Sequence, residues 1–553
     1  MSESAMVRFD RAVEVAAGVF APGHLGELTA LVPFELVDAV LEDTGCVQRR
    51  LRVLPSRVGV YLVLAMVLFP EVGLAGVWAK LTGGLGGLPV ASVSGKALRD
   101  LRRRVSAAPI RALFETVAGP VARPGTAGCF YRGLRPVAVD GCCSFKAPDT
   151  ARNKAVFRVG RRRSGNAGWP GVQLLALAEC GTRALLAATV TALSVGELSA
   201  ARPLLARLDS SMLLLADRAF DADAFLAGVA ARGAQFLIRG SAVRRPAVLA
   251  VLPDGSFLTR IGDLRLRVID AQITVTSADG TVVTGTYRLL TSLTDHRTHP
   301  AEDLVRLYHQ RWEIETCFFG LRHILTGRPV LRSGDPAGVE QEMWALLAVW
   351  QILHTVMADA AACRPGLDPD RCSFTTALAA ARDSVIRAEH IGGHPAPIPG
   401  TIGAAVLAAP LPPRRARTAA RVLKQPGSRY PAHRPGNPRP ATGTAITAHT
   451  TAIQSPTATP VPDPDPNILA AVRTRHRTAG PHLLHALALM HTHPGTTHRA
   501  RELARALGIT GDSPLNTFAV ALNAAATRGH ITKTAPATYT VTPQQALTTP
   551  TNP

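Results

Sequence analysis

Two short apolar runs in the middle of the chain each end in an aspartate, and this arrangement limits the possible folds. The sequence PVAVDG contains Asp140, and MLLLADR contains Asp217. Runs of this length, with turn residues between them, are typical of β-strands. From about residue 128 to 240 such runs alternate with helical segments, in the order three strands, helix, strand, helix, strand. This order predicts an α/β domain with both aspartates at strand ends.

The segment YHQRWEIETCFFGLR has the pattern of a helix that carries polar residues on one face. At ~100° per residue, side chains three, four and seven positions apart share a face. Four polar residues follow that spacing: Tyr308, Arg311, Glu315 and Arg322. Glu313 is predicted to face away from them. One carboxylate, two guanidinium groups and a phenol suit a site that binds a metal ion and a phosphate backbone.

The three carboxylates Asp140, Asp217 and Glu315 are what metal-assisted phosphodiester chemistry requires. Two divalent ions ~3.5–4 Å apart activate the attacking oxygen and stabilise the leaving one. Magnesium prefers carboxylate ligands, so we expect two Mg²⁺ or Mn²⁺ ions, with Asp140 bridging both. Each residue also has an ordinary structural interpretation, because an aspartate after a strand often forms a turn or caps a helix. Asp217 could also pair with Arg218.

Charge predicts a polyanionic partner. The chain has 553 residues, 61 Lys and Arg against 40 Asp and Glu, and a net charge of +21. A protein this basic most often contacts nucleic acid. The start of the chain lacks the apolar core of a secretory signal. The apolar run from Val58 to Phe69 is too short to cross a bilayer and predicts a buried helix. The eight cysteines have no zinc-ligand spacing and are expected to be reduced.

The regions around the α/β domain have different patterns. Residues 1–125 predict a helical N-terminal domain whose segment Ser94–Ala107 is basic and amphipathic. Its consecutive arginines are candidates for DNA contact: Arg102, Arg103 and Arg104. Residues 126–360 form the predicted catalytic domain, with a β-rich insertion at about 241–300 whose last strand returns to the main sheet. Residues 361–430 predict a helical and basic strap in which Arg414 and Arg415 are further candidates for DNA contact.

The C-terminal part predicts a linker and a small domain. Residues 431–475 are rich in Pro, Thr, Ala and Gly, which predicts a disordered linker. In residues 476–545, three helical segments are followed by a two-strand ribbon, which predicts a winged helix–turn–helix. Asn516–Arg528 is its candidate recognition helix. The histidines in this region have no standard zinc-ligand spacing.

The segments VAVDG, LLLADRAF and YHQRWEIETCFFGLR resemble the three motifs of DDE transposases of the insertion-sequence-four family. That family's signature places Tyr, Arg, Glu and Lys at the spacing of residues 308, 311, 315 and 322. This chain has Arg322 in place of the usual Lys, which keeps the charge but replaces a point charge with a planar fork. The resemblance covers residues 10–430 and does not include the C-terminal domain.

The resemblance implies a ribonuclease H-like core with a β insertion and a cut-and-paste reaction at the ends of a DNA element. It also implies that Tyr308, Arg311 and Arg322 hold phosphate, and that two copies act on paired ends. We therefore expect a cytoplasmic, nucleoid-associated transposase whose partners are element ends and target DNA, with no membrane. Two alternatives remain: a domesticated DNA-binding protein without catalysis, and a ribonuclease H-like metal nuclease that cuts without joining.

Overall fold

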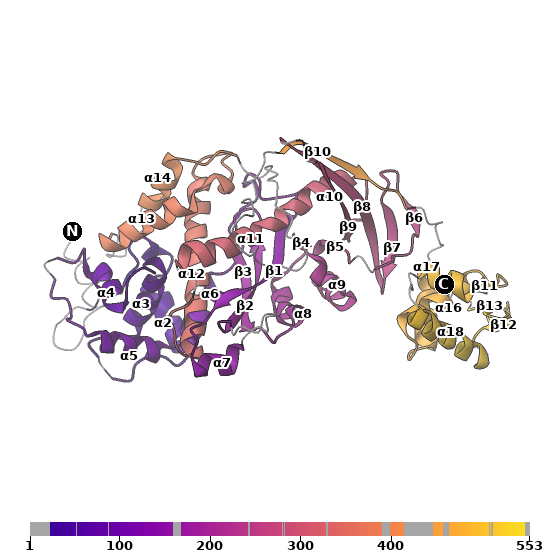
Figure 1. Cartoon of the computed structure of the whole chain (residues 1–553), viewed down its shortest axis with the longest axis horizontal. Helices are drawn as coiled ribbons and strands as arrows, with labels where there is room; N and C mark the ends of the chain where they lie inside the picture. Colours follow the sequence, from indigo (N-terminus) through magenta and orange to yellow (C-terminus); the bar gives the residue numbers. More distant parts are fainter. Residues whose placement is uncertain are drawn as a thin grey trace, which may run out of the picture. The chain divides into compact units, whose positions relative to one another are not determined.

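The computed structural model describes residues 21–547 except 22, 51, 87, 159–167, 242–243, 279, 281, 328–329, 390–398, 414–445, 457–463, 508 and 510–511. The chain forms two compact units (Figure 1). Unit 1 comprises residues 1–215, 232–234 and 309–417, and unit 2 comprises the remainder. Strands and helices occur in both, which confirms the α/β class.

Unit 1 begins with a group of N-terminal helices. They are η2 (Leu28–Ala30), α2 (Phe34–Asp43), α3 (Ser56–Leu68), α4 (Leu74–Thr82), α5 (Gly95–Val105) and α6 (Ala108–Val117). Helix α3 is apolar on every side and almost entirely buried, as expected for the run around Val58. Helix α12 (Pro336–Ala362) contacts both α3 and α6. Because of this packing, the predicted N-terminal domain belongs to the same unit as part of the sheet.

The first strands of the sheet lie in unit 1. They follow the order β3 (Leu185–Ala192), β2 (Gly171–Glu179), β1 (Arg135–Lys146) and β4 (Met212–Ala216). The pairs β1–β2 and β2–β3 are antiparallel. Strand β2 is buried along its whole length, which explains its continuous apolar sequence. Short helices connect the strands: α7 (Ala151–Phe157), α8 (Glu197–Ala201) and η3 (Arg202–Arg207).

Unit 1 continues after residue 308 with the helices that position the site. They are η5 (His309–Arg311), α11 (Trp312–Phe319), the π-helical segment η6 (Gly320–Leu325), α12, η7 (Pro369–Arg371), α13 (Phe374–Ile386) and α14 (Gly400–Ala408). Asp335 caps α12 by accepting a hydrogen bond from the Gly338 amide at 2.9 Å. Helix α12 is long and apolar enough to cross a membrane by length and composition, but 78% of its apolar window is buried inside the protein. It is the core helix of unit 1.

Unit 2 contains the predicted β-rich insertion. Its strands follow the order β5 (Gln235–Arg239), β9 (Val282–Thr291), β8 (Leu264–Ser277), β7 (Phe257–Ile261) and β6 (Ala250–Val251), and every neighbouring pair is antiparallel. The pairing of β9 with β5 confirms that the insertion returns to a strand of the α/β segment. The helical elements of this part are η4 (Arg218–Phe220), α9 (Asp223–Ala230) and α10 (Ala301–Tyr308).

The prediction of a disordered linker over residues 431–475 is wrong in two places. Strand β10 (Ile446–Ile453) pairs antiparallel with β8, and helix α15 (Pro466–Arg475) belongs to the C-terminal module. The sequence ITAHTTAI contains enough β-branched residues to form a strand despite its polar composition. The rest of the linker lies outside the described residues.

The C-terminal module, residues 464–547, has its own hydrophobic core. Its elements are α15, α16 (Pro481–Thr492), β11 (His498–Arg499), α17 (Ala500–Ala506), α18 (Asp512–Thr527), β12 (Thr532–Ala535) and β13 (Thr538–Thr540). The three strands form a separate sheet in the order β11-β13-β12. The module therefore begins with α15, about ten residues before the predicted boundary at 476.

Candidate active site

Asp140 lies in the middle of a strand, where the sequence predicted a strand end. Strand β1 continues to Lys146, and Asp140 is directly opposite Ala176 on β2. The prediction failed because the polar residues after Asp140 interrupt the apolar pattern without interrupting the strand. The side chain of Asp140 is 15% exposed, and one carboxylate oxygen accepts a hydrogen bond from the Gly141 amide at 2.8 Å. Its position is therefore fixed by strand pairing on the side of β2.

Arg311 joins two of the three predicted catalytic carboxylates. Its Nη1 lies 2.9 Å from Oδ2 of Asp140, and its Nη2 lies 3.2 Å from Oε1 of Glu315. The arginine side chain is 8% exposed, and its guanidinium stands 4.7 Å from the centre of the Trp312 ring. Asp140 is 171 positions from Arg311 in the sequence. Two carboxylates from distant segments thus share one buried cation.

The predicted stripe is not carried by one regular helix. Tyr308 ends α10 in unit 2, Arg311 lies in the 3₁₀ turn η5, Glu315 lies in α11 and Arg322 lies in the π-helical segment η6. A 3₁₀ turn has three residues per turn and a π segment has more than 3.6, so a constant rotation per residue does not hold across these joints. Arg311 and Glu315 still form the ion pair expected from helical spacing, because both residues lie at the start of α11.

A buried arginine in the β2–β3 turn anchors α11. Arg183 has a positive φ of 63° and pairs with Glu313 at 2.6 Å and with Asp370. Its carbonyl accepts a hydrogen bond from the Trp350 indole at 2.9 Å. Burial disfavours the charged form of Arg183, but the two carboxylates outweigh that effect and raise its pKa. Glu313 therefore faces away from Glu315, as predicted, and holds α11 against the sheet.

Asp217 and Tyr308 belong to unit 2. Asp217 follows β4 directly, which confirms its predicted place at a strand end. Its Oδ1 accepts a hydrogen bond from the Ala219 amide at 2.8 Å and caps η4, so the ordinary capping role is also present. The Tyr308 hydroxyl donates to the carbonyl of Ala216 at 3.1 Å. Tyr308 therefore holds the backbone immediately before Asp217.

Arg322 lies beside the strand that carries Asp140. Its Nε donates to the carbonyl of Phe318 at 3.4 Å. It is also close enough to Cys142 to oppose, by its charge, the burial that raises the pKa of that thiol. Cys142 is two positions after Asp140 on β1, so the charge of Arg322 acts on the strand that carries Asp140.

Two residues near the carboxylates had no signal in the sequence. A side-chain carbon at Gly141 would overlap the carboxylate of Glu197 and approach Leu175 to 2.7 Å, so Glu197 packs against the backbone beside Asp140. Phe319 is 54% exposed on α11, one turn after Glu315, and its ring centre lies 4.8 Å from that of His323. Glu197 lies outside the three recognised motifs, and Phe319 lies within the third but off its Tyr–Arg–Glu–Arg spacing. The packing of α8 and α11 identifies both.

Among the described residues, no group of three or more His, Cys, Asp or Glu side chains is close enough to hold a metal ion. Asp140 and Glu315 nevertheless present hard oxygen donors to one shared cation, Arg311, and such donors are those that Mg²⁺ and Mn²⁺ take. The donor types of Asp140 and Glu315 therefore suit a divalent cation.

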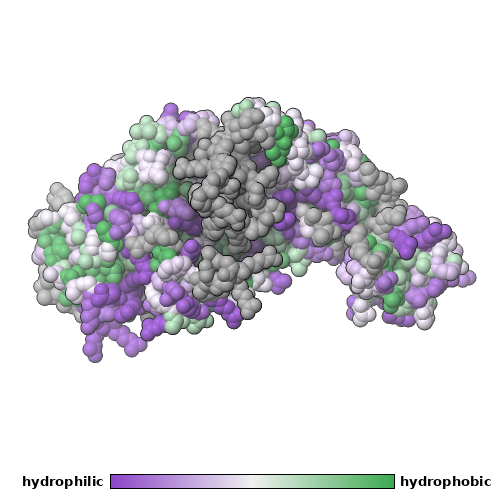
Figure 2. Space-filling model, viewed as in Figure 1, coloured by the Kyte–Doolittle hydropathy of each residue, from purple (hydrophilic) through white to green (hydrophobic). Residues whose placement is uncertain are grey.

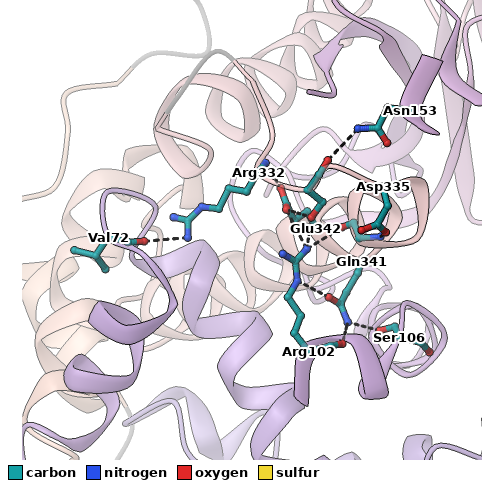
Figure 3. Close-up of polar contacts among 10 residues, drawn as sticks. Val72, Arg102, Ser106, Asn153, Arg332, Asp335, Gln341 and Glu342 are labelled. Atoms are coloured by element: carbon teal, nitrogen blue, oxygen red, sulfur yellow. Dashed lines mark hydrogen bonds and ion pairs between the residues drawn. The ribbon is translucent and has the colours of Figure 1, made fainter. Parts of the chain in front are cut away.

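Arg102, a predicted DNA contact, makes its contacts inside the protein. Its guanidinium pairs with Glu342 at 3.0 Å and donates to Gln341 at 2.8 Å (Figure 3). Glu342 also accepts a hydrogen bond from the Arg332 amide at 2.7 Å. Figure 3 shows these side chains meeting between α5 and the start of α12. Arg104 likewise bonds inward, to the Leu54 carbonyl at 2.6 Å, and burial lowers its pKa.

Of the arginine run, Arg103 faces solvent. It shares the exposed side of α5 with Lys96 and Arg99, at helical spacings of three and four residues. Figure 2 shows hydrophilic residues where α5 lies. The amphipathic pattern of the segment predicted a basic face, and of the three consecutive arginines Arg103 lies on it. Arg414 and Arg415 lie outside the described residues.

Comparison with known proteins gives two family matches. Residues 22–115 match the family described as insertion element 4 transposase N-terminal, and residues 144–352 match the transposase DDE domain. The chain is 26% identical over 416 residues to transposase InsG for insertion sequence element IS4 of Escherichia coli K12, covering 72% of this chain and 91% of that protein. A solved piggyBac transposase synaptic complex with hairpin DNA matches with a TM-score of 0.35 and 10% identity, covering 65% of this chain and 80% of that one.

The family matches agree with the local geometry. The first covers the N-terminal helices, and the second covers strands β2 to β9, the β insertion and Glu315 but begins four residues after Asp140. The three motifs recognised in the sequence fall on β1, on the end of β4 and on the segment from Tyr308 to Arg322. The chain belongs to the insertion-sequence-four family of DDE transposases, enzymes that move an insertion sequence.

Proposed function

We propose that this transposase cuts and joins DNA with Asp140, Asp217 and Glu315 as the ligands of two divalent cations, Mg²⁺ or Mn²⁺. The main support for this proposal is that Asp140 and Glu315 both form ion pairs with the guanidinium of Arg311. Two carboxylates that meet at a single positive charge suit a bound cation. The cations, when bound, activate the attacking oxygen and stabilise the leaving oxygen.

The protein's own residues hold these carboxylates in place. Strand pairing with Ala176 fixes the backbone of Asp140. The hydroxyl of Tyr308 holds the carbonyl before Asp217, and the capping bond to Ala219 orients the Asp217 carboxylate. The ion pair of Glu313 with Arg183 fixes the helix that presents Glu315. Such rigidity matters because a small displacement of a reacting group costs much of the rate.

Arg311 and Arg322 are proposed to hold DNA phosphates. In the structure Arg311 neutralises Asp140 and Glu315. Cations bound to the same carboxylates would repel the guanidinium, and a phosphate oxygen would then be its strongest available partner. Arg322, beside β1, is a second planar donor for the same backbone. Exposed Phe319 offers a ring on which an unpaired base could stack.

We also propose a ribonuclease H-like core and a C-terminal winged helix. The order of β3, β2, β1 and β4, with helices between strands, supports a ribonuclease H-like core. The order of α16, β11, α17, α18, β12 and β13 supports a winged helix in the C-terminal module.

We propose that two copies act together on double-stranded DNA, at the element ends and at the target. An element has two ends, and each chain carries one set of three carboxylates. The exposed stripe of α5, formed by Lys96, Arg99 and Arg103, is proposed to contact backbone phosphates in the N-terminal region. The substrate and the net charge of +21 support action in the cytoplasm, at the nucleoid.

Purified protein incubated with a duplex bearing the element's own ends, a target plasmid and Mg²⁺ or Mn²⁺ tests the proposal. We expect metal-dependent cleavage and joining, which Asp140→Asn, Asp217→Asn and Glu315→Gln each abolish. Glu302→Gln, which changes an exposed carboxylate on α10, is the matched control and should retain both reactions. Mass photometry with and without end DNA measures the number of copies in the complex.

Two alternative outcomes have distinct signatures. Cleavage without joining would identify a metal nuclease of the same fold. Binding of the ends without cleavage in either metal would identify a DNA-binding descendant. Full activity in all three carboxylate variants would refute the assignment of the site.

A further inference from the structure

Helix α18 of the C-terminal module has two chemically different faces. One face packs into the core of the module through Phe518, Leu522 and Ala525. The opposite face is exposed, and six of its residues lie within ~120° at ~100° per residue: Ser513, Asn516, Thr517, Val520, Asn523 and Thr527. We call these six residues the outer stripe of α18.

The outer stripe contains no charged residue, although the module is basic. Residues 464–547 contain eight Lys and Arg but only three Asp and Glu. Val520, near the centre of the stripe, is 68% exposed and adds an apolar side chain to this face. The side chain of Asn516 makes no hydrogen bond to any described residue. The hydroxyls of Thr517 and Thr527 donate to carbonyls of their own helix. The stripe therefore presents the Asn516 amide and several methyl groups to solvent.

Cationic side chains border this neutral stripe. Lys533, on β12, donates from its Nζ to Oδ1 of Asn523 at 2.9 Å. Arg528 directly follows α18, and both Arg528 and Arg475 act on His530, whose pKa is lowered first by burial and further by these two charges. His530 and His476 are in ring contact at 4.3 Å, which joins α15 to the end of α18. Positive charge is thus placed beside the stripe and at its C-terminal end.

This division of chemistry matches the two tasks of a helix bound to duplex DNA. Phosphates are held by cations, whereas base edges are contacted by hydrogen bonds and apolar groups. Asparagine pairs well with the N6 and N7 edge of adenine, and Thr or Val methyl groups pack on the methyl group of thymine. Guanine is usually contacted by Arg or Lys, and the outer stripe has neither.

We propose that α18 lies in the major groove of duplex DNA, where Asn516, Thr517 and Val520 contact A·T base pairs while Lys533 and Arg528 contact phosphates. The proposal depends on the winged-helix assignment of the module and not on the catalytic carboxylates. It assigns to this transposase a second DNA site, outside both matched family regions, with its own sequence preference.

Fluorescence anisotropy of the full-length protein in metal-free buffer tests this site. The probes are two short labelled duplexes without element ends, one composed of A·T pairs and one of G·C pairs. We expect a preference of about tenfold for the A·T duplex. Asn516→Ala should remove most of that preference. Lys533→Ala should weaken binding equally to both duplexes and lower the salt dependence by about one unit of slope.

Val520→Glu and His482→Glu form a matched pair, because each adds one negative charge to an exposed position of the same module. We expect Val520→Glu to weaken binding to the A·T duplex by tenfold or more, and His482→Glu to have little effect. An unchanged preference in both Asn516→Ala and Val520→Glu would overturn the proposal. A changed oligomeric mass in Val520→Glu, with unchanged DNA affinity, would identify α18 as a protein contact instead. Failure of the catalytic proposal would leave these metal-free measurements unaffected.

Discussion

Arg311 and Asp140 form an ion pair of 2.9 Å although they are 171 positions apart in the sequence. The arginine side chain is 8% exposed and the aspartate 15%, so water screens the pair only weakly. The same guanidinium reaches Glu315 at 3.2 Å. The charge that a divalent cation would supply to these carboxylates is thus supplied by the protein itself.

Arg311→Gln should strengthen cation binding in the absence of DNA and weaken catalysis. The substitution removes a positive charge that competes with the cation for Asp140 and Glu315. It also removes a proposed phosphate contact, which should lower the cleavage rate by a factor of about 100. Titration calorimetry with Mn²⁺ measures the first effect, and a single-turnover cleavage assay measures the second.

Arg306→Gln is the control for that experiment, because Arg306 is 67% exposed and pairs with Glu302 and Asp303 on its own helix. It should leave Mn²⁺ affinity and cleavage close to those of the parent protein. Equal Mn²⁺ affinity in Arg311→Gln and the parent protein would show that Arg311 does not compete with the cation for the two carboxylates.

Arg183→Leu should destabilise the protein strongly. It would leave Asp370, whose side chain is 2% exposed, and Glu313 without their shared cation. Removing one partner of a buried ion pair typically costs about 3–5 kcal/mol. Arg103→Leu, at a position 73% exposed, should cost less than about 1 kcal/mol. Thermal melting of both variants gives the comparison, and a similar melting temperature for the two would contradict it.

Gly141→Ala should impair catalysis by displacing Glu197. The added methyl group would overlap the Glu197 carboxylate beside Asp140. We expect a lower cleavage rate with unchanged affinity for end DNA, and partial recovery in the double variant Gly141→Ala, Glu197→Ala. Cleavage rates and anisotropy on the same duplex provide the measurement. No recovery in the double variant would assign the defect to Leu175 or to the strand itself.

His24 should make the N-terminal helices sensitive to acid. Its Nε2 lies 2.7 Å from the Leu81 carbonyl and its Nδ1 accepts a hydrogen bond from the Gly26 amide, which requires the neutral ring. Burial lowers its pKa from 6.5 to about 4. Because the pKa is lower in the folded state, this stabilisation is complete above pH 6.5 and decreases as the pH falls toward 4. At pH 5 the loss is about 2 kcal/mol.

Hydrogen exchange of peptides covering residues 23–31, corrected for the intrinsic effect of pH, measures this change in local opening. The variant His24→Gln keeps a donor and an acceptor but does not titrate, so its opening free energy should be nearly constant between pH 7 and pH 5. A parent protein with equally constant protection would show that His24 is not the responsible group.

The sequence predicted those features of the fold that depend on local patterns. The strand before Asp217, the buried helix around Val58 and the return of the insertion through β9 were all predicted. Asp140 was assigned to a strand end because apolar periodicity stops there, whereas the strand is continued by backbone pairing with β2. Backbone pairing of this kind leaves little trace in a single sequence.

The residues of the site were easier to predict from the sequence than their arrangement in space. Arg311 and Glu315 were placed on one face, and they do interact. The change from 3₁₀ to α to π geometry around them has no local signal. Arg102 was assigned to the surface because arginine usually lies there, but its partner Glu342 is 240 positions away in sequence. Such long-range pairing can be established only from the fold.

Strand β10 sets a limit on where the C-terminal module can reach. Twelve residues, 454–465, connect the last residue of β10 with the first residue of α15. Even fully extended, a segment of that length spans only about 40 Å. That distance equals roughly a dozen base pairs of duplex at ~3.4 Å each. Any DNA sequence bound by α18 must therefore lie close to the place where β10 joins the insertion sheet, and lengthening this tether should widen the permitted spacing.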